Sequence, residues 1–305
     1  MEYHEPVLLE ESIEWLAIRR DGTYIDATFG GGGHSRRILE VLGDKGRLYG
    51  FDQDEEAIPN IPKDERFTFV HHNFRYMKRF LRFHGVERVD GILADLGVSS
   101  HQFDRPERGF SYRFDSPLDM RMNRQLPRTA ADLLNDYEAD RLQDIFSRYG
   151  QVRNARTLAR AIVEARERRL FSKVSDLLEL LDALVRGARQ RYMAQVFQAL
   201  RIEVNDEMGA LREFLQQSVQ YLKPGGRLVV ISYHSVEDRM VKNTMKTGGV
   251  EGRASKDFYG NVQRPLRPLT KKPVRPSDEE VARNPRARSA RLRAAERLPD
   301  TEKGS

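Results

Sequence analysis

The chain has 305 residues, enough for one large α/β domain and a smaller second domain, and its 39% hydrophobic content suits a protein with a buried core. Lys and Arg number 52 against 46 for Asp and Glu, and the net charge of +6 permits a polyanionic partner without requiring one. Cysteine is absent, which excludes disulfides, thiolate metal sites, iron–sulfur chemistry and a cysteine nucleophile, and no metal site is expected.

No stretch of the sequence resembles a membrane span or a targeting signal. The longest apolar runs, such as residues 228–231, are bounded by polar residues and fall far short of the roughly 18–20 residues that cross a bilayer. Residues 1–10 are acidic and lack the basic start and the apolar stretch of a signal peptide. We therefore expect no membrane-spanning segment and a cytoplasmic location.

Short apolar strands alternate with helical stretches in the first third of the chain. Strands are predicted at 23–27, 47–51, 67–70 and 89–94. Helices are predicted between them at 35–42 and 75–84. A strand, a helix and a strand within about 30 residues form a βαβ unit, which implies a parallel sheet with right-handed crossovers. This part of the chain therefore predicts half of a doubly wound α/β fold.

After Asp95 the alternation stops, and the next strand is predicted at 227–233, following a turn at 222–226. This gap is far longer than one crossover helix needs. Helical patterns fill much of it, at 129–134 with Thr129 as N-cap, 138–149, 155–169 and 175–185. The gap therefore predicts a helical insertion in the α/β domain.

The boundaries follow from these patterns. The α/β domain has a first part at 1–116, an inserted helical domain at 117–202 and a second part at 203–305, which begins with a helix at 205–222. Prolines and arginines crowd the end of the chain, as in a disordered tail. Against that, Ser277–Glu280 has capping-box spacing, and apolar residues at 290, 292 and 294 alternate with arginines. We therefore predict a short C-terminal helix and an edge strand.

A glycine-rich turn, Gly30–His34, stands between the first predicted strand and the first helix. Such a turn lets the backbone approach a ligand and presents N–H groups at a helix N-terminus, which indicates a nucleotide-type site. The Gly-x-Gly-x-x-Gly pattern of nicotinamide enzymes is matched only in part, because Ser35 stands at its third glycine position. The turn alone does not decide between ligand classes.

Two acids close predicted strands downstream of this turn. Asp52 stands where a carboxylate accepts hydrogen bonds from ribose hydroxyls, although an acid here can also merely cap the next turn beside Asp54. Asp95 stands at the carboxyl edge of the sheet, where it can hold the cofactor and face the substrate. The Lys223–Gly226 turn is common to methyltransferases of this fold class. Together these features favour an S-adenosylmethionine-dependent methyltransferase over an NAD-dependent oxidoreductase.

Long segments in a fixed order carry a more specific resemblance, at 4–9, 24–35, 95–102, 108–112, 117–122, 231–239 and 284–290. Through them the chain resembles, nearly end to end, the ribosomal RNA small-subunit methyltransferase H family, also called MraW. The resemblance implies a Rossmann-like class I methyltransferase sheet with an inserted all-helical, substrate-recognition domain. It also implies methyl transfer from S-adenosyl-L-methionine to N4 of a cytidine in the decoding region of 16S rRNA in the small ribosomal subunit.

The resemblance also implies which residues contact the cofactor: Gly32, Gly33, His34, Asp52, Phe74, Asp95 and Gln102. Without it, Phe74 would be interpreted as ordinary packing. Two positions depart from the family, which commonly has Phe where this chain has Tyr233 and Leu where it has Val236. Both changes roughly conserve volume, so we expect them to leave the site undisturbed.

The chemistry of an exocyclic amine narrows the catalytic candidates. Its lone pair is delocalised into the cytosine ring, so acceptors for its N–H protons are needed to hold it in line with the methyl group. Asp95 is the first candidate and the segment 232–235 the second, but His234 can equally be a hydrogen-bonded structural histidine. The absence of cysteine disfavours methylation at pyrimidine C5, and the Leu-Gly-Val that follows Asp95 disfavours a DNA amino-methyltransferase.

Arginines near the predicted pocket favour RNA as the partner, since arginine binds phosphates and stacks on splayed bases. They are Arg105, Arg108, Arg113, Arg121, Arg124, Arg153, Arg156 and Arg160. Any one of them can be an ordinary solvated charge. The alternatives left open are another S-adenosylmethionine-dependent RNA or DNA amino-methyltransferase, an NAD-dependent oxidoreductase, and a non-catalytic RNA-binding assembly factor.

Overall fold

The computed structural model describes residues 6–253, 255–256 and 262–299, so positions 4 and 5 of the family-like segment 4–9 lie outside the described residues. Contacts divide the chain into two units, and each is described by itself. The first unit is Met1–Gly97 with Met208–Ser305, and the second is Val98–Glu207.

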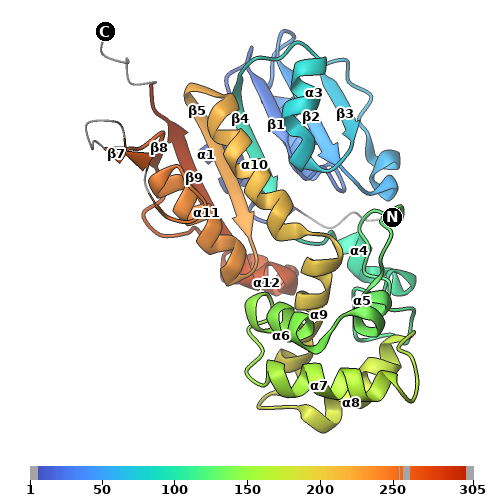
Figure 1. The fold of residues 1–305 in the computed structure, drawn as a ribbon. Coiled ribbons are helices and arrows are strands. Elements are labelled where there is room, and N and C mark those ends of the chain that lie inside the picture. Colours follow the sequence, from blue (N-terminus) through green and yellow to red (C-terminus); the bar gives the residue numbers. More distant parts are fainter. Residues whose placement is uncertain (1–5, 254, 257–261, 300–305) are drawn as a thin grey trace. The chain divides into compact units, whose positions relative to one another are not determined.

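Within the described residues, seven strands of the first unit form one sheet in the order β3-β2-β1-β4-β5-β9-β8 (Figure 1). The strands are β1 (Thr23–Asp26), β2 (Arg47–Asp52), β3 (Phe67–His71), β4 (Val89–Asp95), β5 (Leu222–Ser232), β8 (Leu266–Pro268) and β9 (Arg291–Arg297). β1 to β5 run parallel, whereas β9 is antiparallel to β5 and to β8. The first five strands have the doubly wound order, which confirms the predicted α/β fold.

The helices of the first unit lie on both faces of this sheet. They are α1 (Leu9–Leu16), α2 (Gly33–Val41), α3 (Met77–Phe83), α10 (Glu207–Tyr221), α11 (Ser235–Thr247) and α12 (Asp278–Arg283). Because parallel crossovers are right-handed, α2, which leads from β1 to β2, and α10, which leads into β5, lie on opposite faces. Shorter elements are the 3-10 turns η1 (Glu55–Asn60), η2 (Phe74–Tyr76) and η4 (Pro285–Ser289), and the pair β6 (Ser255–Lys256) and β7 (Val262–Gln263).

The end of the chain differs in part from the prediction. The short helix is confirmed as α12, but the strand after it is not an edge strand, because β9 lies between β5 and β8. One of its arginines, Arg293, is also buried and not solvated. Arg293 is 9% exposed because its guanidinium donates twice to the carboxylate of Asp238 in α11, at 2.7 and 3.1 Å. The predicted turn at 223–226 lies within β5, as a bulge opposite Asp90.

The second unit is helical and has a core of its own. Its helices are α4 (Ser100–Asp104), η3 (Pro106–Arg108), α5 (Ala130–Asp136), α6 (Ala139–Arg148), α7 (Ala155–Arg166), α8 (Val174–Leu184) and α9 (Arg189–Val204). Their buried side chains form one cluster that includes Phe146, Leu158, Leu177 and Val196. Thr129 caps α5 as predicted, because its Oγ1 accepts the N–H of Asp132 at 3.2 Å. No helix in the described part of the chain is long and apolar enough to cross a membrane.

The second unit extends beyond both predicted limits of the insertion, residues 117 and 202. On one side, the Arg108 guanidinium donates to the carbonyl oxygen of Met122 at 2.9 Å. On the other, the side-chain oxygen of Asn205 accepts the N–H of Met122 at 2.7 Å. Both flanking segments are therefore tied into the helical unit by contacts that local sequence patterns do not reveal.

Candidate functional site

Three carboxylates stand where neighbouring parallel strands end at one edge of the sheet. Asp26 ends β1, Asp52 ends β2 and Asp95 ends β4. Burial raises the pKa of Asp26, and it raises the pKa of both Asp52 and Asp95 to about 6. Because buried like charges disfavour one another, this edge of the sheet favours a ligand that carries positive charge.

Asp26 is a member of this group that sequence reasoning did not assign to the site. It is 1% exposed, and its Oδ2 accepts the hydroxyl proton of Ser35 at 2.7 Å while its Oδ1 accepts the N–H of Thr28 at 3.1 Å. The signal was available in the sequence. Asp26 closes its strand as Asp52 does, and the two strands are neighbours in any βαβ unit.

Asp52 holds the glycine-rich loop. Its Oδ2 accepts the N–H of Gly30 at 2.7 Å, and its Oδ1 accepts the N–H of Asp54 at 2.9 Å. The carboxylate thus caps the turn after β2, and each oxygen keeps a further lone pair for a ligand hydroxyl. A Cβ on Gly30 would meet nothing nearer than the carbonyl oxygen of Thr28 at 3.9 Å, so the backbone beside Asp52 is open to a ligand.

Glycine is needed at Gly32 and at Gly33, the N-cap and the first residue of α2, for different physical reasons. Gly32 is the N-cap with φ of 74°, a left-handed conformation, and no side chain caps the helix. Gly33 is required by the protein itself, because a Cβ there would lie 2.1 Å from Cγ of Pro6. The N–H groups of the first turn of α2 are therefore presented without a capping side chain, as an anion-binding helix N-terminus requires.

His34 lies among the acids. Its ring is 5% exposed, with Nε2 at 3.2 Å from the carbonyl oxygen of Val7. Its positive potential lowers the pKa of both Asp26 and Asp95, against the larger effect of burial. The imidazole therefore favours the ionised form of both carboxylates.

Asp95 is contacted by a hydroxyl that sequence reasoning dismissed. The hydroxyl of Tyr233 donates to Asp95 Oδ1 at 2.8 Å, and the N–H of Asp95 donates to Thr28 Oγ1 at 2.7 Å. The expectation that Tyr233 leaves the site undisturbed is therefore wrong. Volume was the wrong criterion, because the added hydroxyl forms a hydrogen bond with a charged group.

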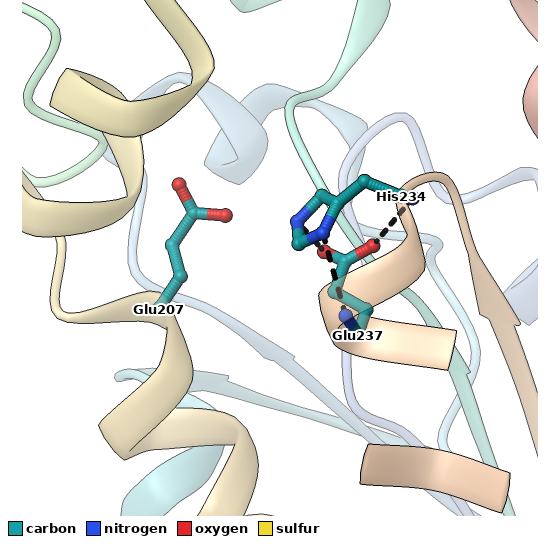
Figure 2. A group of neighbouring side chains, drawn as sticks. All are labelled: Glu207, His234 and Glu237. Atoms are coloured by element: carbon teal, nitrogen blue, oxygen red, sulfur yellow. Dashed lines mark hydrogen bonds and ion pairs between the residues drawn. The ribbon is translucent and has the colours of Figure 1, made fainter. Parts of the chain in front are cut away.

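His234 is held by Glu237 at the beginning of α11 (Figure 2). Its Nδ1 accepts the N–H of Glu237 at 3.3 Å, and its Nε2 lies 3.1 Å from Glu237 Oε1, an ion-pair distance without hydrogen-bond geometry. Because Nδ1 accepts, the neutral ring carries its proton on Nε2, beside this carboxylate. The geometry favours a structural N-cap over a free base. Glu207, also drawn in Figure 2, belongs to the second unit, where it accepts from Arg201 at 2.7 Å.

Phe74 and Gln102, the remaining expected cofactor contacts, occupy different units. Phe74 begins η2 shortly after β3, and its half-buried ring packs against Phe214 of α10, with centroids 5.1 Å apart and ring planes tilted by 60°. Gln102 belongs to the second unit, is 6% exposed, and its side chain accepts the N–H of Ser99 at 3.1 Å in a capping box.

The arginines singled out for RNA contact divide into two groups. Arg108 is 2% exposed and donates to backbone carbonyls, and Arg121 is paired with Asp119 at 2.8 Å. The expectation of RNA contact is wrong for Arg108, because its guanidinium is committed to holding the fold. The others are exposed: Arg105, Arg113, Arg124, Arg153, Arg156 and Arg160.

The chain is similar in sequence to a known protein family and to several named proteins. Residues 1–298 match the sequence profile of the MraW methylase family. A protein from Bacteroides fragilis named ribosomal RNA small subunit methyltransferase H is 58% identical over 296 residues, which are 97% of each chain. Proteins of the same name from Parabacteroides distasonis and Flavobacterium johnsoniae are 56% and 55% identical, over 97% and 98% of this chain and 98% and 99% of their own. A solved rRNA methylase from Streptococcus thermophilus aligns with a TM-score of 0.42 at 11% identity, over 94% of this chain and 95% of its own.

Proposed function

The chain belongs to the MraW methylase family, and from this premise we propose that it methylates N4 of a cytidine in the decoding region of 16S ribosomal RNA. The methyl donor of this family is S-adenosylmethionine. The name of the curated relatives supports small-subunit ribosomal RNA as the substrate, in the assembled subunit or as free RNA. Such a substrate also favours the cytoplasmic location expected from the sequence.

The observation that carries the proposal is the row of carboxylates at the ends of β1, β2 and β4, of which Asp26 is buried and Asp52 and Asp95 are half-buried. S-adenosylmethionine carries a sulfonium and an ammonium, and these cations complement acids whose pKa burial has raised. The open backbone at Gly30 and the uncapped N-terminus of α2 fit the nucleoside and carboxylate parts of the same molecule. The residues present therefore suit the cofactor.

In the proposed site, Asp52 accepts hydrogen bonds from the ribose hydroxyls while it holds Gly30. Phe74 offers its half-buried ring to the adenine, and Phe214 packs against that ring. The backbone of Gly33 and His34 supplies N–H donors to the carboxylate of the cofactor, whereas the N–H of Gly32 donates to the carbonyl oxygen of Phe29 at 2.7 Å, so Gly32 contributes a turn without a side chain. The contact expected from Gln102, in the second unit, stays a prediction.

When bound, S-adenosylmethionine supplies an electrophilic methyl group on its sulfonium sulfur. The chain's own contribution is to hold the amine with its lone pair turned out of the cytosine ring. We assign this to Asp95, whose carboxylate accepts an N–H of the amine and takes up the proton that the nitrogen loses. His234 is the weaker candidate, because Glu237 engages its ring.

Six exposed arginines of the second unit support it as the RNA-binding part: Arg105, Arg113, Arg124, Arg153, Arg156 and Arg160. Arg153, Arg156 and Arg160 lie on or just before α7, so their charges recur along one short stretch. Such a surface suits a phosphate backbone without requiring sequence-specific contacts.

A methyl-transfer assay tests the proposal. The protein is incubated with labelled S-adenosylmethionine and with small subunits, or their RNA, from a strain that lacks this enzyme. Nucleoside mass spectrometry should find N4-methylcytidine as the labelled nucleoside. Label in another nucleoside would replace the proposed target, and calorimetric binding of NAD in place of S-adenosylmethionine would support an oxidoreductase. Cofactor binding with no transfer to any form of the RNA would support an assembly factor.

A further inference from the structure

The side chain of Tyr233 lies directly on the carboxylate to which the proposed function assigns the proton transfer. Its hydroxyl donates to Asp95 Oδ1 at 2.8 Å, although the two residues are 138 positions apart in the sequence. Within the described part of the chain, Asp95 Oδ2 has no hydrogen-bond partner. One oxygen of the carboxylate is thus engaged and the other is left with its lone pairs free.

Both partners are held by backbone contacts at the ends of β4 and β5. The N–H of Tyr233 donates to Glu237 Oε2 at 2.9 Å, which fixes the residue at the beginning of α11. A Cβ on Gly97 would lie 3.5 Å from Cδ2 of the Tyr233 ring, so the ring packs closely on the chain that leaves β4. The N–H of Asp95 is anchored on Thr28 Oγ1 at 2.7 Å. The hydrogen bond therefore joins two fixed positions.

We propose that Tyr233 is a positioning residue of the methyl transfer, whose hydroxyl holds Asp95 through Oδ1 so that Oδ2 accepts the N–H of the cytidine amine. This inference rests on the proposed function, since it names how the acceptor is oriented. A hydroxyl that donates to a carboxylate also favours the ionised form, which is the form that can accept a proton.

The groups around Asp95 make the Tyr233 hydroxyl important for keeping this carboxylate ionised. Burial raises the pKa of Asp95, and the nearby carboxylates of Asp26 and Glu237 raise it further. His34 and the Tyr233 hydroxyl act in the opposite direction and lower it. His34 is shared with Asp26, whereas the hydroxyl of Tyr233 is the hydrogen-bond donor to this carboxylate. Without the Tyr233 hydroxyl, the carboxylate of Asp95 is ionised only at higher pH.

The test uses the full-length protein with the substitution Tyr233→Phe and measures methyl transfer to small-subunit RNA from pH 5.5 to pH 8.5. We expect kcat to fall about tenfold at pH 6 and less than about threefold at pH 8.5, because the lost hydrogen bond stabilised the ionised carboxylate. The acid limb of the pH profile moves to higher pH. The dissociation constant for S-adenosylmethionine at pH 8.5 stays within about twofold, because the hydroxyl orients the acceptor and not the cofactor.

Tyr24→Phe is the matched control. Tyr24 is 1% exposed, and its hydroxyl accepts the N–H of Arg19 at 2.7 Å at the opposite end of the same sheet. This control loses a buried tyrosine hydroxyl without touching Asp95, so its pH profile should match that of the unchanged protein.

Three results overturn the inference in distinguishable ways. An unchanged kcat and pH profile in Tyr233→Phe removes Tyr233 from the reaction while the proposed function stands. An equal loss of kcat at every pH, or a loss shared by Tyr24→Phe, shows a merely structural hydroxyl. Absence of methyl transfer by the unchanged protein on any form of the RNA refutes the proposed function itself, and the inference with it.

Discussion

At the scale of single residues, the site is dominated by the balance between burial and charge. Asp26, Asp52 and Asp95 end adjacent strands, and each has a raised pKa because burial disfavours its charged form. The folded protein alone therefore carries charges that are costly without a cation nearby. A cationic ligand relieves that cost, which is a physical reason for the fit between these acids and a sulfonium cofactor.

Asp52→Ala is predicted to weaken binding of S-adenosylmethionine by roughly 10- to 100-fold. The substitution removes charge-assisted hydrogen bonds to the ribose, each worth on the order of 1.5–3 kcal/mol, and releases the N–H of Gly30 from the carboxylate. Isothermal titration calorimetry measures the dissociation constant. Glu55→Ala, an exposed acid just beyond, is the control and should bind normally. An unchanged constant in Asp52→Ala would remove Asp52 from the cofactor site.

Asp95→Asn is predicted to abolish turnover yet raise the melting temperature at pH 8 by a few degrees. Burial raises the pKa of Asp95 from 3.8 in the unfolded chain to about 6, so its contribution to stability is present below pH 3.8 and lost as the pH rises through 6. At pH 8 the buried charge costs up to about 3 kcal/mol, which the neutral amide avoids while its oxygen still accepts from Tyr233.

Thermal melts of the unchanged protein and of Asp95→Asn at pH 8 and pH 4 check whether the variant is the more stable of the two at pH 8. At pH 4 the aspartic acid is itself protonated, so the difference in melting temperature should largely vanish. A variant that melts at or below the unchanged protein at pH 8 would contradict the assignment of a costly buried charge to Asp95.

At the scale of elements, β9 shows how an arginine-rich strand comes to lie inside a sheet. Arg293 alternates with apolar residues as in a half-solvated strand, but its guanidinium lies under α11 against Asp238. The pair is nearly enclosed, with side-chain exposures of 11% and 14%. The sequence of a strand shows which residues alternate between its two faces. Whether the polar face is exposed to solvent depends on the helix that packs on it, which here is α11.

Asp238→Ala is predicted to lower the free energy of unfolding by about 3–5 kcal/mol, because it leaves the buried guanidinium of Arg293 without its partner. Glu10→Ala is the matched control, since it breaks an ion pair to Arg37 whose side chains are 69% and 35% exposed. The control should cost less than about 1 kcal/mol. Urea titrations followed by circular dichroism measure both values. Equal losses in the two variants would show that Arg293 is not held by Asp238.

At the scale of the whole molecule, the chain consists of a sheet unit made from two segments distant in the sequence and a helical unit formed by the residues that follow the first segment and precede the second in the sequence. The helical unit has its own buried core, in which α6, α7 and α9 pack together. A continuous segment with a complete core has what it needs to fold alone.

We therefore predict that residues 98–207, produced alone, give a helical circular dichroism spectrum and a cooperative thermal transition. Phe146→Ala in this fragment should cost about 3–5 kcal/mol, because Phe146 is fully buried in its core. Arg148→Ala, a side chain 64% exposed on the same helix, is the control and should change little. A fragment without a cooperative transition would show that the sheet unit is required for the helices to pack.

The sequence by itself determined the features that depend on local pattern. Alternating strands and helices, the glycine-rich turn, the cap at Thr129, and acids at 52 and 95 that close strands are all legible within short windows. They rest on backbone geometry and periodicity, which neighbouring residues decide. The long family-like segments, taken in their order along the whole chain, indicated the reaction and the cofactor.

Only the tertiary structure decided which distant residues meet. Tyr233 reaches Asp95, Pro6 occupies the space that a side chain at Gly33 would need, and Arg108 is buried where a surface cation was expected. None of these contacts has a local signal, because each joins segments that chain folding brings together. Hydrogen bonding and burial act through space, so the orientation of the acceptor carboxylate depends on the packed ends of β4 and β5.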